Sequence, residues 1–147
     1  LWHAFTVQGA VKMQRKWMGE LYVNILLHTY IAENEPTLLP ALTLFPQMVV
    51  GGGSKGFKYT SLNDLEKNYN ELGSKYPRNY GWYQCRWHYA AAGIYDASGK
   101  DVNRKLWDAL KSQNAILTDE QLVTLLSSAG SESVADVMVN WDKNMIP

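Results

Sequence analysis

The sequence predicts an all-α fold of about six helices, an irregular bundle with a long proline- and glycine-rich loop over residues 34–58. Apolar residues recur at helical spacing along most of the chain, and no segment shows the strict alternation of a β-strand. Capping residues and glycine stops separate the periodic segments. Because the 147 residues show no repeat and no second domain, we expect residues 1–147 to form a single helical domain.

The expected helices are read in order along the chain. Residues 1–14 are expected to complete a helix and a turn, with a break at Gln8-Gly9. Full helices are expected over residues 15–33, 61–72, 82–97, 101–112, 118–128 and 134–144. The expected N-caps are Ser61 or Asn63, Thr118 in a capping box with Gln121, and Ser131 or Ser133. Residues 76–81 are predicted as a turn.

The loop over 34–58 is predicted from its prolines and glycines. Pro36, Pro40 and Pro46 interrupt the helical pattern, and a proline disfavours helix in the residue before it. The glycine run 51–56 lacks the GxxxxGK[ST] pattern of a phosphate loop, so we expect a plain loop.

Composition excludes several classes of function. Lys plus Arg and Asp plus Glu number 14 each, which gives no indication of a nucleic-acid partner or of a membrane surface. The longest apolar stretches fall short of the roughly 20 residues that span a bilayer. Cys85 is the only cysteine, so neither an internal disulfide nor a cysteine-based zinc site can form. The cysteine count does not assign the protein to a cellular compartment. We expect Cys85 to be a small buried hydrophobe.

Glu20 is the most informative residue, because it lies in a helix that is apolar nearly all the way round. Such a helix is normally buried, and a buried carboxylate needs a cation, a metal or good hydrogen-bond donors. At ~100° per residue, Glu20 shares one face with Trp17, Leu21, Asn24, Ile25, His28 and Ile31. The structural reading is a carboxylate satisfied by an arginine or by backbone donors, with Asn24 as a core amide.

For the other candidate residues, a structural role is the first expectation. We expect His28 to be a core histidine bonded to a carbonyl, and His3 and His88 to have structural or surface roles. The aromatic residues of 82–97 are expected in the core, with a peptide-binding wall as the alternative. The small residues at 90–93 would allow a neighbouring helix to approach closely.

The run Lys16–Asn24, KWMGELYVN, resembles the second zinc-binding helix of gluzincin metallopeptidases. In that family an HExxH motif supplies two histidine ligands and the general-base glutamate, and the second helix supplies a third ligand. The resemblance implies that Glu20 is this third metal ligand. It also implies that Asn24, where thermolysin-like members have an aspartate, orients a zinc-bound histidine. The family spacing places the last histidine of HExxH at Leu1 or at the residue before it, and Leu1 is not histidine.

The downstream part is similar to the helical C-terminal region that closes one side of the cleft in such enzymes. A tyrosine in the cleft can stabilise the oxyanion of the tetrahedral intermediate, and Tyr80 and Tyr83 are the candidates. In the intact parent, the upstream glutamate would activate a zinc-bound water to attack the peptide carbonyl.

Because the chain opens on Leu1-Trp2 without an initiator methionine, we expect it to be a fragment of a longer protein. The resemblance then implies a zinc-dependent peptidase as the parent, with a peptide substrate or the missing N-terminal part as partner. We expect the fragment alone to hold no zinc and to be inactive. The alternative is a non-enzymatic helical module that binds a peptide or a protein. Association through the exposed N-terminus is a further expectation.

Overall fold

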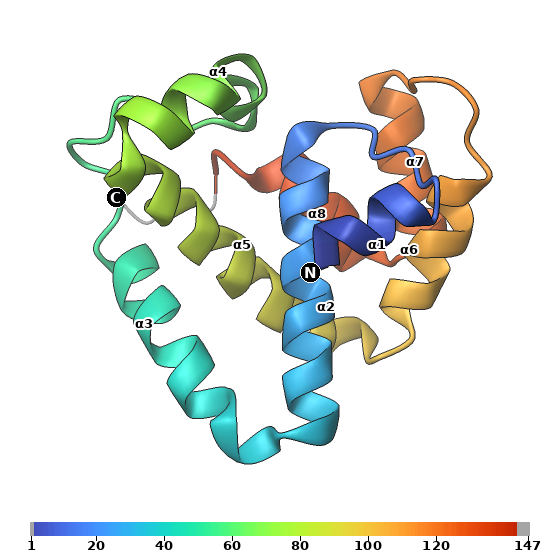
Figure 1. Ribbon diagram of the computed structural model, residues 1–147, viewed down its shortest axis with the longest axis horizontal. Helices are drawn as coiled ribbons and strands as arrows, with labels where there is room; N and C mark the ends of the chain where they lie inside the picture. The colour runs from blue at the N-terminus through green and yellow to red at the C-terminus, as the bar shows by residue number, and fades with distance from the viewer. Residues whose placement is uncertain (1, 144–147) are drawn as a thin grey trace.

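The computed structural model describes residues 2–143 and shows helices throughout, with no strand among these residues (Figure 1). The helices are α1 (Trp2–Gln8), α2 (Lys16–Asn34), the 3-10 turn η1 (Pro36–Leu38), α3 (Leu39–Gly51), α4 (Leu62–Lys75), α5 (Pro77–Ser98), α6 (Val102–Lys111), α7 (Asp119–Ala129) and α8 (Glu132–Asn140). The all-α class is confirmed. The expected count of about six is wrong, because the described residues form eight α-helices.

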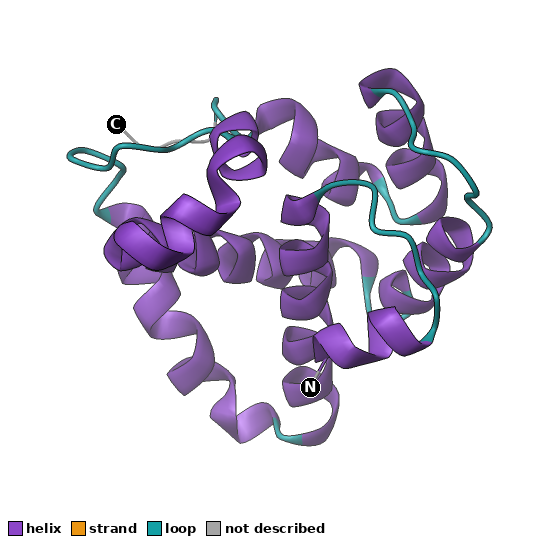
Figure 2. Cartoon of the chain, turned by 45° about the horizontal axis from the view of Figure 1, so that its top comes forward, coloured by secondary structure: helices purple, strands orange, loops and turns teal. Residues whose placement is uncertain are grey.

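The long helices α2 and α5 form the centre of the molecule, and α3 packs against α5 (Figure 1). From η1, α2 and α3 diverge as two arms, and α5 crosses between them. The short helix α1 lies across α2, and the teal loops of Figure 2 join the helices around this centre. This arrangement leaves α5 with two sides, one against α2 and one toward α3 and α8.

An aromatic cluster holds α2, α5 and the end of α8 together. Trp87 of α5 stacks on Trp17 of α2, with ring centroids 6.2 Å apart, and on Trp141 at 4.3 Å. Trp141 also lies parallel to Tyr83 at 6.0 Å, and its indole N–H donates to the carbonyl of Thr60. The core reading of the aromatic residues in 82–97 therefore holds for Trp82, Tyr83 and Trp87, which are buried.

The loop predicted over 34–58 is wrong for most of its length, because η1 and α3 occupy residues 36–51. Pro36 and Pro40 lie in the first turns of these elements, where the backbone N–H has no helical partner and its absence costs nothing. Pro46 lies inside α3, where a proline costs about 3 kcal/mol in an isolated helix. The packing of α3 against α5 offsets that cost.

The turn predicted over 76–81 is wrong for a similar reason, since α5 begins at Pro77. Proline at the first helical position has a favourable φ and lacks only an N–H that would be unpaired. The two capping boxes are present, Ser61 with Asp64 and Thr118 with Gln121. Ser131 occupies the N-cap of α8 without a side-chain capping bond.

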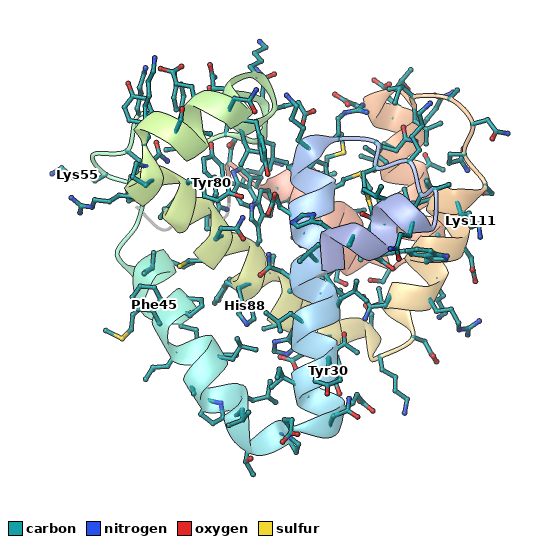
Figure 3. The ribbon with its side chains drawn as sticks, in the orientation of Figure 1. Tyr30, Phe45, Lys55, Tyr80, His88 and Lys111 are labelled. Carbon is teal, nitrogen blue, oxygen red and sulfur yellow. The ribbon has the colours of Figure 1, made fainter. Side chains whose placement is uncertain are left out.

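None of the helices within residues 2–143 is both long and apolar enough to cross a membrane. The outer side of α3 is nevertheless apolar: Leu44, Phe45 and Met48 are each more than half exposed (Phe45 is labelled in Figure 3).

Candidate functional site

Glu20 lies in the second turn of α2 and is 5% exposed. Trp17, Leu21 and Ile25 are buried beside it, so the apolar face of α2 carries the carboxylate into the interior. The Tyr69 hydroxyl, from α4, donates to Oε1 at 2.5 Å, and the Gln84 amide, from α5, donates to Oε2 at 2.7 Å. Each carboxylate oxygen therefore has a donor, which offsets part of the cost of burying the charge.

Tyr80, which is labelled in Figure 3, contacts two members of this cluster. Gln84 Nε2 lies 2.9 Å from the Tyr80 hydroxyl, and the rings of Tyr80 and Tyr69 meet edge to face at 6.1 Å. Burial raises the pKa of both tyrosines, and the hydrogen bond to Glu20 raises that of Tyr69 further. Both hydroxyl groups are therefore protonated at neutral pH.

Asn24 orients Gln84 and does not touch the carboxylate of Glu20. Its Nδ2 donates to the backbone carbonyl of Glu20 at 2.9 Å and to Gln84 Oε1 at 3.4 Å. Because Gln84 Oε1 accepts from Asn24, the Gln84 amide nitrogen is the atom that faces Glu20. These contacts agree with the expectation that Asn24 is a hydrogen-bonded amide in the core.

His3 of α1 is the nearest basic group to Glu20. Its Nε2 lies 3.9 Å from Glu20 Oε1, and its side chain is mostly exposed. Within residues 2–143 no arginine or lysine forms an ion pair with Glu20. The sequence predicts an arginine or backbone donors as the partners of Glu20, whereas the structure has the side chains of Tyr69 and Gln84 in that role. Both residues are distant from Glu20 in the sequence.

The residues around Glu20 do not make a complete metal site by themselves. No group of three or more His, Cys, Asp or Glu side chains within the described part of the chain could hold a metal ion. Glu20 and His3 are two candidate donors, whereas a catalytic zinc takes three protein ligands and a water. A metal at this position would need further ligands from outside these residues.

Tyr83, the second tyrosine proposed from the sequence, lies elsewhere. It is fully buried, its ring stacks on Trp87 and Trp141, and its hydroxyl donates to the carbonyl of Ser61 at 2.7 Å. Burial raises the pKa of this hydroxyl. Of the two tyrosines, the structure brings only Tyr80 to Glu20.

The contact between α2 and α5 continues past Glu20 to a pair of buried histidines. The rings of His28 and His88 lie 5.6 Å apart, and Tyr95 lies 5.4 Å from His28. His28 Nδ1 and His88 Nε2 are buried, and neither has a hydrogen-bond partner among the described residues, so the carbonyl bond expected for His28 is not made through Nδ1. Burial lowers the pKa of His28 and lowers that of His88 to about 4, so both are neutral at pH 7.

Sequence reasoning missed Tyr69, Gln84 and Arg86. The first two carry no motif and reach Glu20 only through the packing of α4 and α5 on α2. Arg86 is a buried cation on the opposite side of α5. The only feature of the sequence that could have indicated its burial is its position in a helix rich in aromatic residues. Comparison of the chain with protein-family models, with curated proteins and with solved structures finds no match.

Proposed function

We propose that this chain is the helical part that follows the HExxH motif in a gluzincin-like zinc peptidase, with Glu20 as the third metal ligand. In this proposal α4 and α5 form one wall of the substrate cleft, and Tyr80 lies beside the metal ligand. The chain by itself does not hydrolyse peptides, because it contains no HExxH.

The observation that carries the proposal is the missing positive charge at Glu20. Tyr69 and Gln84 supply hydrogen bonds but no charge, and the mostly exposed His3 imidazole is 3.9 Å away. Burying a carboxylate without a counter-ion costs several kcal/mol of folding stability. A carboxylate has about four lone-pair sites, so a metal ion can bind while both donors stay in place.

The position of α1 also supports the proposal. His3 brings α1 next to Glu20, so a helix that extends α1 in the N-terminal direction would run close to the carboxylate. Two histidines one turn apart on such a helix, together with Glu20 on α2, form the usual three-ligand arrangement of a catalytic zinc. The protonated Tyr80 hydroxyl could then donate to the oxyanion that develops on a peptide carbonyl.

The test is zinc binding by a chain that includes the residues encoded upstream of Leu1. We expect those residues to contain HExxH ending next to Leu1, and the longer chain to bind one zinc ion. Glu20→Gln should weaken zinc binding by at least about tenfold with the fold retained, as loss of a ligand does. The matched control is Glu33→Gln, which removes another carboxylate of α2 that accepts from a tyrosine, Tyr95.

Two results would overturn the zinc proposal: an upstream sequence without HExxH, or equal zinc affinity of the Glu20→Gln variant and the unchanged longer chain. A third measurement concerns the 147-residue chain alone, for which we expect no chelator-sensitive hydrolysis of peptides. Turnover from a clean preparation would show a catalytic site that the proposal does not contain.

The second candidate function is a non-enzymatic helical module that binds a peptide or a protein. The exposed apolar side chains of α3, Leu44, Phe45 and Met48, favour it. In this case Glu20 is a structural carboxylate, and the zinc affinity of a longer chain does not depend on it.

A further inference from the structure

A groove of about 960 Å³ runs along the side of α5 that is turned away from α2. Five residues of α5 line it at helical spacing, namely Arg86, Tyr89, Ala90, Gly93 and Ile94. Helices α7 and α8 form the other wall, and Val50 of α3 lies at one side. Gln84 and His88, which contact α2, point to the opposite side of α5, so this groove is separate from the Glu20 cluster.

The small residues of α5 leave this groove open. A Cβ added at Gly93 would meet no atom within 4 Å, so the close approach of a helix that the sequence suggested does not occur there. Most of the wall is apolar, and its aliphatic members are Val50, Ala90, Ile94, Val123, Ala135, Val137 and Val139. Ligand sites commonly have a volume of roughly 300–1,000 Å³ and an apolar lining with a few placed polar groups.

Arg86 is the placed polar group of this groove. It is 8% exposed; its Nη2 donates to the carbonyl of Trp141 at 2.7 Å, and its guanidinium lies 3.5 Å from the centroid of the Trp141 ring. Nη1 is buried without a hydrogen-bond partner, and no carboxylate within residues 2–143 forms an ion pair with Arg86. Burial lowers the pKa of Arg86 to about 10, so the group is still charged at neutral pH. The negative charge of the exposed Asp142, which is not within ion-pair distance, opposes this shift.

An anion bound in the groove would balance the charge of Arg86 and accept a hydrogen bond from its unpartnered nitrogen. The planar guanidinium matches a carboxylate, which it can bind through two parallel hydrogen bonds. The rim of the groove carries Glu132, Asp136 and Lys143, all exposed to solvent, where their charges are screened. One buried guanidinium balances one negative charge, so a monoanion fits better than a dianion.

We infer that this groove binds an organic monocarboxylate with a straight hydrocarbon chain, the carboxylate at Arg86 and the chain along Ala90 and Gly93. A peptide would place amide groups in the same apolar space. The helical walls have used their backbone donors and acceptors internally, and no strand edge in the described residues could pair with an extended peptide. A hydrocarbon chain has no such groups to satisfy.

The experiment is calorimetric titration of the unchanged chain with decanoate, below its critical micelle concentration. Decyltrimethylammonium, which has the same chain and the opposite charge, is the comparison ligand. We expect decanoate to bind with one site and at least tenfold more tightly than the cation. Absence of decanoate binding, or equal binding of the two ligands, would overturn the inference, as would binding of a peptide with an apolar C-terminus in place of decanoate.

Two glycine variants locate the site without touching Arg86. Gly93→Leu fills the groove at an exposed helical position and should weaken decanoate binding at least tenfold. Gly73→Leu makes the same change on α4, also at a position with open space, and should leave binding as it is. Equal binding by Gly93→Leu and the unchanged chain would place decanoate elsewhere and reject the groove.

Arg86→Met then tests the charge. This variant keeps an unbranched apolar side chain, and we expect decanoate to lose its preference over decyltrimethylammonium. If Arg86→Met unfolds, the glycine pair still decides where decanoate binds, and the two ligands of opposite charge decide whether the carboxylate matters. No metal takes part, so failure here leaves the zinc proposal for Glu20 standing, and the reverse also holds.

Discussion

The two sides of α5 each carry a buried charge, and the fold satisfies the two charges to different degrees. On the α2 side, both oxygens of Glu20 accept hydrogen bonds, from Tyr69 and Gln84. On the groove side, Arg86 donates to Trp141 through one terminal nitrogen while the other has no partner. The first site is complete in hydrogen bonds and has no arginine or lysine in an ion pair, whereas the second lacks one hydrogen bond and has no ion pair, with only the more distant charge of Asp142 acting on Arg86. Hydrogen bonding and charge balance are thus separate requirements, and the ligand proposed for each site has the opposite charge.

The largest effect is expected from Trp141→Ala, which would remove the groove side of this comparison. Trp141 is buried, stacks on Trp87 and Tyr83, and supplies both the ring and the carbonyl that hold Arg86. Truncation of a buried tryptophan costs about 3–5 kcal/mol. Urea denaturation should show this loss, and a loss below about 1 kcal/mol would mean that α8 does not depend on Trp141.

Acidification should weaken the α2 side more than the groove side, through His88. The folded chain holds the pKa of His88 at about 4, whereas the ordinary value is 6.5. Between these values the unfolded chain binds a proton that the folded chain does not, so stability falls as the pH is lowered from 6.5 to 4. The full difference between these two pKa values corresponds to at most about 3–4 kcal/mol, and solvent screening reduces the expected loss to about 2–3 kcal/mol. His28, whose pKa is also lowered, adds to it.

The measurement is the free energy of unfolding at several pH values for the unchanged chain and for His88→Phe. The variant should lose less stability over this pH window. His3→Gln, a change at an exposed position, keeps both buried imidazoles and should show the unchanged chain's dependence. Identical pH profiles for His88→Phe and the unchanged chain would show that His88 is not held neutral.

Glu20→Gln should have a smaller effect, because the partners of Glu20 are neutral. The new amide still accepts one hydrogen bond, and the Tyr69 hydroxyl or the Gln84 amide must turn to satisfy the other contact. The strained hydrogen bonding costs about 1 kcal/mol, while removal of an unbalanced buried charge stabilises the fold, so we expect a change of at most about 1 kcal/mol by urea denaturation. A loss above about 3 kcal/mol would instead indicate a buried ion pair and would contradict the absence of charge balance at this site. Glu33→Gln, on the exposed end of α2, is the control.

The smallest effect concerns the open space over Gly93. Leucine is a better helix former than glycine by somewhat under 1 kcal/mol, so Gly93→Leu and Gly73→Leu should each raise stability by about 0.5–0.8 kcal/mol. Melting temperatures of the two variants should therefore rise together. A fall for Gly93→Leu alone would show that the groove is closed by side chains and has no room for a ligand.

The sequence predicts those elements whose signals are local. The boundaries of α2 and α7 follow from periodicity, from Pro36 and from the Thr118 capping box, and the structure agrees to within one or two residues. The sequence fails where proline is taken as a break. Pro40 and Pro77 lie at helix starts, where proline is favourable, and Pro46 is carried by tertiary packing, which no local rule registers.

The same division applies to the candidate site. The apolar surroundings of Glu20 in the sequence predict its burial, and the resemblance to the peptidase family points to Tyr80 near a helix start. The donors of Glu20 could not be predicted, because Tyr69 and Gln84 lie 49 and 64 residues away and meet it only once three helices have packed. Tyr83 shows the converse: three positions from Tyr80 on the same helix, it turns into the aromatic core.

Cys85 lies between Gln84 and Arg86, in the middle of the helix that separates the two sites, and it is buried. Burial raises the pKa of its thiol, so a thiol reagent has neither access nor a thiolate to attack while α5 is in place. Because Cys85 is the single cysteine of the chain, the rate of its alkylation measures how often the central helix α5 opens transiently. A ligand on either side of α5 that binds only the closed form would slow the alkylation, so one unmodified thiol can report occupancy of both sites.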